Sequence, residues 1–130
     1  HGKYEPPSPY DSCFNFTKEE HDITKIPRYQ RHCDISDPSF YVAHYDGEIK
    51  YTDYHIGQVL NKLRELGLAG ETFVVFTSDH GETMTEHLWW FDHGCFVYEE
   101  QIHVPLLLWY AHRHSTYNLR RFANKSCKRT

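Results

Sequence analysis

The 130-residue sequence has no long apolar run and no excess of basic residues. Its longest near-continuous apolar stretch, residues 104–111, is interrupted by a proline. A membrane-spanning helix needs about 20 apolar residues, so we expect no transmembrane segment. No secretory leader with a basic start and an apolar stretch is visible. The 14 Lys and Arg against 18 Asp and Glu give a net charge of −4, which disfavours a general nucleic-acid binder.

Cysteine is scarce and irregularly spaced. The four cysteines are Cys13, Cys33, Cys95 and Cys127, and none forms a Cys-x-x-Cys pair. A disulfide framework or a structural zinc site would need a tighter pattern. The sequence therefore leaves the redox state of these residues open.

Histidine and aromatic residues are plentiful, with 11 His and 16% aromatic residues. In a chain of this polarity, so many aromatic side chains predict surface that is buried against something outside the chain. The charge is also uneven, because residues 112–130 hold six basic residues and no acidic one. We treat this stretch as a basic tail of unassigned role.

The order of predicted elements indicates an α/β fold. Residues 1–37 are rich in proline and predict an extended, irregular segment that lies on something else. A helix is predicted from a cap at Ser36 or Asp37 to a stop at Gly67. Apolar runs at 72–77 and 102–110 predict two strands that are buried on both faces, as in a doubly wound, mostly parallel sheet. Two strands and one helix cannot close such a sheet, so we expect part of a larger domain.

The chemistry is concentrated in Ser78-Asp79-His80-Gly81-Glu82, directly after the first predicted strand. Ligands of open α/β sheets bind at the carboxyl ends of the strands. Asp79 and His80 can bind one divalent cation, with Ca²⁺ or Mg²⁺ favoured by oxygen ligands and Zn²⁺ or Mn²⁺ by imidazole. Gly81 is expected to allow a sharp turn. His93, in a second loop, can contact an anionic substrate or protonate a leaving group.

These motifs together resemble the sulfatase family of the alkaline phosphatase superfamily. Five segments in the family's order carry the resemblance: His1–Tyr10, Tyr45–Asp53, Ser78–Glu82, Phe91–Gly94 and His103–Leu106. The resemblance implies that residues 1–111 are the C-terminal portion of a sulfatase-like catalytic domain. It also implies the doubly wound sheet of that superfamily.

The resemblance further implies sulfate ester hydrolysis by a formylglycine nucleophile with a divalent cation, usually Ca²⁺. By matching positions, Asp79 and His80 would bind the metal. His93 would stand where the family has a basic residue that contacts sulfate, and His1 would match a histidine on the sulfate side. The implied substrate is a sulfated small molecule or glycan, and the implied location is secreted, periplasmic or lysosomal.

One part of the family pattern is missing. No cysteine here lies in the Cys-x-Pro-x-Arg motif that becomes formylglycine, and no Asp-Asp metal pair is present. We therefore expect a chain that needs an N-terminal half of the domain and has negligible activity alone. The alternatives are a phosphodiester or phosphonate hydrolase, a phosphoethanolamine transferase of the same superfamily, or a non-catalytic module that holds metal or sulfated glycan.

Overall fold

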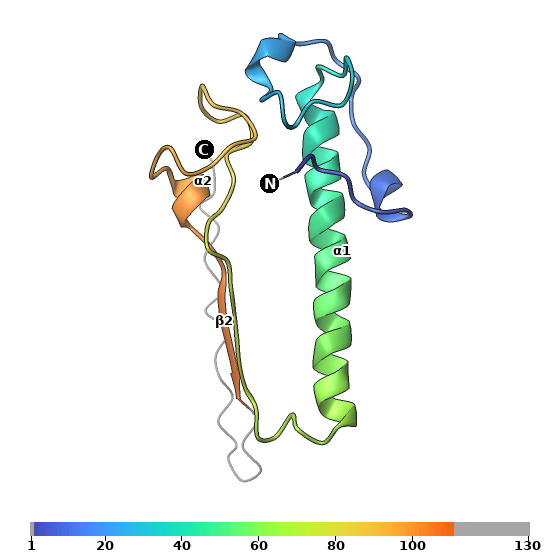
Figure 1. Cartoon of the computed structure of the whole chain (residues 1–130), viewed down its shortest axis with the longest axis vertical. Helices are drawn as coiled ribbons and strands as arrows, with labels where there is room; N and C mark the ends of the chain where they lie inside the picture. The colour runs from blue at the N-terminus through green and yellow to red at the C-terminus, as the bar shows by residue number, and fades with distance from the viewer. Residues whose placement is uncertain (1, 111–130) are drawn as a thin grey trace, which may run out of the picture.

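The computed structural model describes residues 2–110, which form one long helix beside a two-stranded antiparallel sheet (Figure 1). His1 and the predicted basic tail at 112–130 lie outside the described residues. In chain order, the elements are the short 3₁₀ helices Tyr10–Ser12 and Ile23–Lys25, α1 (Pro38–Glu65), β1 (Phe73–Thr77), α2 (Glu99–Ile102) and β2 (Leu106–Tyr110). No described helix is long and apolar enough to cross a membrane.

Helix α1 begins and ends where its capping residues predict. The Asp37 carboxylate accepts a hydrogen bond from the Ser39 backbone N–H at 2.8 Å, and Pro38 occupies the first turn. At the other end Gly67 has a φ of 71°, and the N–H of Leu68 donates to the Leu63 carbonyl at 3.0 Å. This is a Schellman ending, which needs the left-handed conformation that glycine adopts at low cost.

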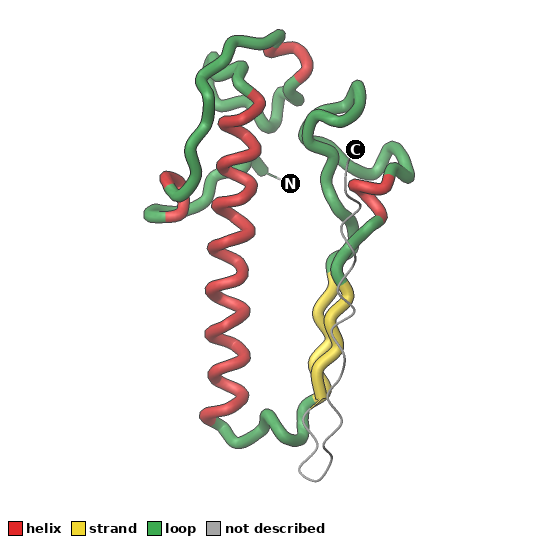
Figure 2. The backbone as a smooth tube through the Cα atoms, turned by 180° about the vertical axis from the view of Figure 1, so that it is seen from behind, coloured by secondary structure: helices red, strands yellow, loops and turns green. Residues whose placement is uncertain are grey.

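The N-terminal segment packs on the first half of α1, as its composition predicts. The segment approaches so closely at Gly47 that a Cβ there would meet the Tyr10 carbonyl oxygen at 2.6 Å. Figure 2 shows this segment and the loop after β1 gathered at the same end of the molecule. The buried hydrophobic cluster lies at that end and joins both to the helix; it consists of Tyr4, Ile26, Phe40, Tyr41 and Phe91.

Phe91 connects this cluster to the predicted site. Its side chain is fully buried, and its ring centroid lies 5.2 Å from that of Tyr41 on α1. Its φ of 52° is unusual for a residue with a Cβ, and burial of the aromatic ring offsets the cost of that conformation. Because Phe91 precedes Asp92 and His93, the core fixes the position of the second site loop.

The two strands are present, but their surroundings differ from the prediction. β1 and β2 pair antiparallel, with Phe73 opposite Tyr110 and Thr77 opposite Leu106. Each residue of β2 is exposed, and β1 alternates between exposed and half-buried residues. The prediction of strands buried on both faces is therefore wrong for residues 2–110. The predicted start of the second strand was also wrong, because Ile102 is the last residue of α2.

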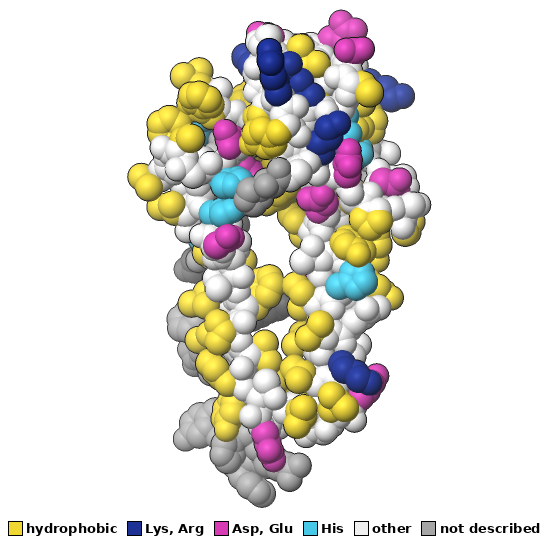
Figure 3. All heavy atoms as spheres, in the orientation of Figure 1, with side chains coloured by type: hydrophobic (Ala, Val, Ile, Leu, Met, Phe, Trp, Pro, Cys, Tyr) yellow, Lys and Arg dark blue, Asp and Glu magenta, His cyan; other side chains and the backbone are white. Residues whose placement is uncertain are grey.

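Apolar side chains cover much of the surface of the strands and of the second half of α1 (Figure 3). Val59 on the helix is 63% exposed and Leu106 on β2 is 62% exposed. The predicted helix is confirmed, and the buried positions of α1 all lie in its first three turns. Three cysteines are described, and Cys13, Cys33 and Cys95 are all free thiols.

Candidate metal and substrate site

Three predicted site residues, Asp79, His80 and His93, lie on two chain segments that a short β-bridge holds together. The first segment, 78–82, leaves the end of β1, and the second returns beside it through a bridge between Thr83 and Asp92. The Thr83 N–H donates to the Asp92 carbonyl at 3.2 Å. In an antiparallel bridge the next residues outward also face each other, which places Glu82 opposite His93.

The α2 segment supports this bridge from one side. Gln101 is 5% exposed, and its side-chain amide donates to the Thr83 hydroxyl at 2.7 Å. The Gly81 N–H donates to the Gln101 carbonyl at 2.7 Å. Gly81 has no positive φ, and a Cβ on it would overlap the Glu100 carbonyl oxygen. The glycine is needed for this close approach, which corrects the expectation of a sharp turn.

The structure brings His80 and His93 together. Their rings are stacked, with centroids 3.8 Å apart and planes 14° from parallel. His80 Nδ1 lies 2.7 Å from the Gly81 carbonyl oxygen, which can only accept a hydrogen bond, so Nδ1 is the donor. In the neutral ring the lone pair is then on Nε2, the atom suited to bind a metal.

Asp79 and His80 fit a divalent cation as two ligands of a larger set. The Asp79 side chain is 87% exposed, and its Oδ1 lies 3.7 Å from His80 Nε2. Two ligands of one cation, each about 2.0–2.6 Å from it, lie within about 5 Å of each other, so this separation is compatible with a shared ion. Residues 2–110 contain no group of three or more His, Cys, Asp or Glu side chains that could hold a metal.

A cleft of about 270 Å³ opens beside these loops. Its wall is formed by the N-terminal segment at Gly2 and Lys3, by α1 at Glu48, and by the loop at His80. His1 lies outside the described residues, but its neighbour Gly2 lines this cleft. Lys3 adds a basic side chain that no sequence motif predicts to be part of the site; its position two residues after His1 is the one signal in the sequence.

Glu82 is the enclosed acid of the site. Its side chain is 9% exposed, and its two oxygens lie 3.2 and 3.3 Å from His93 Nδ1. Burial raises the pKa of Glu82, and the hydrogen bond and charge of His93 act in the opposite direction. Burial, and then the charge of Glu82, raise the pKa of the Tyr4 phenol. No sequence pattern predicts a role for either Glu82 or Tyr4.

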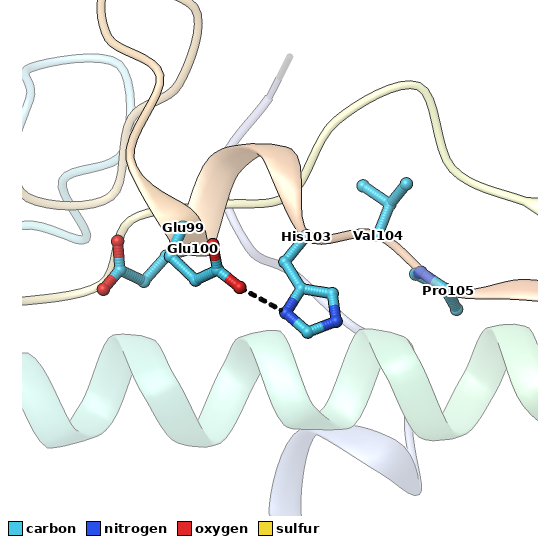
Figure 4. A pocket seen from close by; sticks show the side chains of 5 residues that line it. All are labelled: Glu99, Glu100, His103, Val104 and Pro105. Atoms are coloured by element: carbon cyan, nitrogen blue, oxygen red, sulfur yellow. Dashed lines mark ion pairs between the residues drawn. The ribbon is translucent and has the colours of Figure 1, made fainter. Parts of the chain in front are cut away.

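A separate hollow of about 360 Å³ lies along α2 and the residues between α2 and β2 (Figure 4). It is lined by Glu99, Glu100, His103, Val104 and Pro105. His103 Nδ1 lies 2.7 Å from Glu99 Oε1, so these two side chains form an ion pair when the histidine is protonated. The hollow contains none of the predicted site residues, and we do not include it in the site.

The Asp79-His80 loop follows β1, and the ring of His93 is stacked on that of His80. Comparison with family models identifies the class: the sulfatase model matches residues 1–126, so the chain belongs to the sulfatase family. Sulfatases are hydrolases with an α/β fold, and the described residues contain both a helix and a sheet.

Three curated relatives are similar to parts of the chain. Arylsulfatase K of Xenopus laevis is 39% identical over 66 residues, which are 51% of this chain and 12% of the relative. Human iduronate 2-sulfatase is 37% identical over 65 residues, which are 50% of this chain and 12% of the relative. N-acetylglucosamine-6-O-sulfatase of Bacteroides thetaiotaomicron is 39% identical over 70 residues, 54% of this chain and 12% of the relative.

The chain therefore spans about an eighth of the length of each of these three relatives. No solved structure matches it. The comparisons establish the family, and the roles of individual residues rest on the geometry of the site.

Proposed function

We propose that the full-length protein containing this chain hydrolyses sulfate esters, converting R–O–SO₃⁻ and water to R–OH and HSO₄⁻. The observation that carries the proposal is His80 at the wall of a cleft that Lys3 also lines, with the ring of His93 stacked on that of His80. Lys3 and a histidine can attract a compact negative charge, and a bound divalent cation would offset the carboxylates of Glu48 and Glu82, which line the same cleft.

In this proposal Asp79 and His80 hold a divalent cation, which is Ca²⁺ by family resemblance, with Mg²⁺, Mn²⁺ or Zn²⁺ as alternatives. The cation would neutralise charge on the sulfate oxygens. His93 and His1 would contact the sulfate, and one of them would give a proton to the departing oxygen of R–OH. Lys3 would add a positive charge at the cleft wall.

The nucleophile would come from outside this chain. In sulfatases it is a formylglycine made from a cysteine, and none of the four cysteines here has the required Cys-x-Pro-x-Arg context. We therefore expect residues 1–130 alone to have negligible activity. We also propose that β1 and β2 belong to a larger doubly wound, mostly parallel sheet, whose other elements would cover the exposed apolar strands.

The proposed substrate is a sulfated small molecule or glycan. Two of the relatives carry names that specify a sulfated sugar, iduronate 2-sulfate and N-acetylglucosamine 6-O-sulfate. We extend that class of substrate to this protein, together with a secreted, periplasmic or lysosomal location.

The test is turnover by the full-length protein with three probes: 4-nitrophenyl sulfate, N-acetylglucosamine 6-sulfate and bis(4-nitrophenyl) phosphate. We expect hydrolysis of a sulfate ester that Asp79→Ala lowers by at least about 100-fold. Asp53→Ala, an exposed acid on α1, is the matched control and should retain full activity. Turnover of the phosphate diester alone would assign a phosphoryl-transfer relative instead. Tight binding of the sulfated sugar without turnover would assign a binding module.

A further inference from the structure

Glu82 differs in its surroundings from Asp79, the acidic residue proposed as a metal ligand. Its side chain is 9% exposed, whereas that of Asp79 is 87% exposed. Burying a carboxylate costs folding free energy unless the carboxylate is hydrogen-bonded, so a buried Glu82 needs a hydrogen-bond partner. That partner is His93, whose own side chain is only 16% exposed.

The backbone fixes this pairing. Glu82 and His93 are the residues next to the bridged pair Thr83 and Asp92, so the bridge sets them opposite each other. Thr83 is fully buried and Gln101 is hydrogen-bonded to its hydroxyl, which holds the bridge in register. Both oxygens of Glu82 then lie within 3.3 Å of a single atom, His93 Nδ1.

We propose that Glu82 is a positioning residue for His93: its carboxylate accepts the Nδ1–H hydrogen bond, fixes the plane of the imidazole ring and makes Nε2 the nitrogen that acts on the sulfate ester. This inference rests on the proposed function for the role of His93. A carboxylate that accepts a hydrogen bond from one ring nitrogen of a histidine commonly fixes the tautomer and orientation of the imidazole in this way. Glu82 lines the cleft, but both of its oxygens lie against His93 Nδ1, so in this proposal it acts on the ester only through His93.

A competing role for Glu82 is ligation of the metal together with Asp79 and His80. Its enclosure and its pairing with His93 favour positioning over ligation. The two roles differ in a measurable way. A positioning residue acts only through His93, so its removal costs little once His93 is gone, whereas the effect of a metal ligand persists without His93.

The chain offers a matched control in a second Glu–His pair. His87 Nε2 lies 3.2 Å from Glu100 Oε2, the same separation as between Glu82 and His93. Both members of this control pair are about one-third exposed, and neither lines the cleft. Glu100→Ala therefore removes a comparable contact outside the proposed site.

The experiment compares the full-length protein with Glu82→Gln, Glu82→Ala, His93→Ala, Glu82→Ala/His93→Ala and Glu100→Ala. The substrates are 4-nitrophenyl sulfate, whose leaving phenolate needs no proton, and N-acetylglucosamine 6-sulfate, whose leaving alkoxide does. We expect Glu82→Ala to lower kcat by about 10- to 100-fold for the sugar sulfate and less for the aryl sulfate. Glu82→Gln, which keeps an oxygen acceptor, should recover part of the loss, and Glu100→Ala should match the parent.

The double variant decides between the two roles. We expect Glu82→Ala to cost no more than about twofold when His93 is already alanine. Multiplicative losses, or equal losses for both substrates, would overturn the positioning role.

Histidine ¹⁵N NMR gives a second readout that needs no turnover: Nδ1 of His93 should be protonated in the parent protein and should lose that preference in Glu82→Ala. An unchanged tautomer would contradict the inference even if the protein hydrolyses sulfate esters. A changed tautomer without hydrolysis would contradict the proposed function alone.

Discussion

The α-carbon of Gly81 faces the backbone carbonyl of Glu100 with no room between them for a methyl group. This contact and the hydrogen bond from the Gly81 N–H to Gln101 attach the Asp79-His80 loop to α2. The distance between the proposed metal ligands and α2 therefore depends on the absence of a side chain at residue 81.

We predict that Gly81→Ala destabilises the protein by about 1–3 kcal/mol, because the backbone of α2 must shift to remove the overlap. Urea unfolding of the parent and the variant measures the change. Gly57→Ala is the control, since a Cβ at Gly57 meets nothing within 4 Å. Gly57 lies inside α1, so this substitution should stabilise by up to about 1 kcal/mol. If Gly81→Ala and Gly57→Ala change the free energy of unfolding equally, the close contact with Glu100 does not constrain residue 81.

A second prediction concerns the pH dependence of the Asp37 cap. Burial by itself would raise the pKa of Asp37, but hydrogen bonds from Ser39 and from the backbone at 18–19 outweigh it and lower the pKa. A carboxyl whose pKa is lower in the folded state stabilises the fold above its unfolded pKa of about 3.9, and this contribution is lost as the pH falls through the folded value.

Asp37→Asn should therefore destabilise the protein by about 1 kcal/mol near neutral pH, and the difference from the parent should shrink at pH 3 and below. Urea unfolding at pH 6 and pH 3 provides the comparison. Asp53→Asn, on the exposed surface of the same helix, should show little difference at either pH. A difference for Asp37→Asn that stays constant with pH would show that charge has no part in the cap.

The success of the sequence in locating α1 has a local cause. The signals at Asp37 and Gly67 act on backbone groups one to five residues away, so neighbouring residues are enough to predict both ends. The strands were located for a similar reason, by their apolar runs. Their direction and burial depend on segments far away in the chain or outside it, and residue periodicity does not encode those.

The candidate site shows the same difference between features set by neighbouring residues and features set by distant ones. The closeness of Asp79 and His80 could be predicted because the two residues are adjacent on one loop, and their role as metal ligands stays a prediction. The pairing of Glu82 with His93 depends on the bridge between Thr83 and Asp92, and the sequence alone does not specify that register. The placement of Lys3 at the cleft depends on packing of the N-terminal segment against α1.

A third prediction addresses metal binding by the full-length protein. After dialysis against a chelator, adding Ca²⁺ at about 100 times its Kd should stabilise the protein by about 2.7 kcal/mol through binding to the folded state. Asp79→Ala and His80→Ala should remove most of this stabilisation, because each deletes one of two proposed ligands on the loop. Thermal unfolding with and without Ca²⁺ gives the readout, with Asp53→Ala as the control. If Asp79→Ala responds to Ca²⁺ like the parent, Asp79 is not a ligand.

A fourth prediction concerns Lys3, an exposed cation at the wall of the cleft. An anionic ester should bind more weakly without it, so we expect Lys3→Ala to raise KM for a sulfate ester by roughly 3- to 10-fold with a smaller change in kcat. Lys3→Arg should restore most of the affinity, because the charge is kept. Since the contact is exposed to solvent, the difference in KM between the parent and Lys3→Ala should shrink as salt is raised from about 0.05 to 0.5 M.

Lys62→Ala provides the control, as Lys62 pairs with Glu65 near the end of α1 at 3.0 Å and lies outside the cleft. If Lys62→Ala raises KM as much as Lys3→Ala, the effect belongs to the net charge of the protein and not to the cleft.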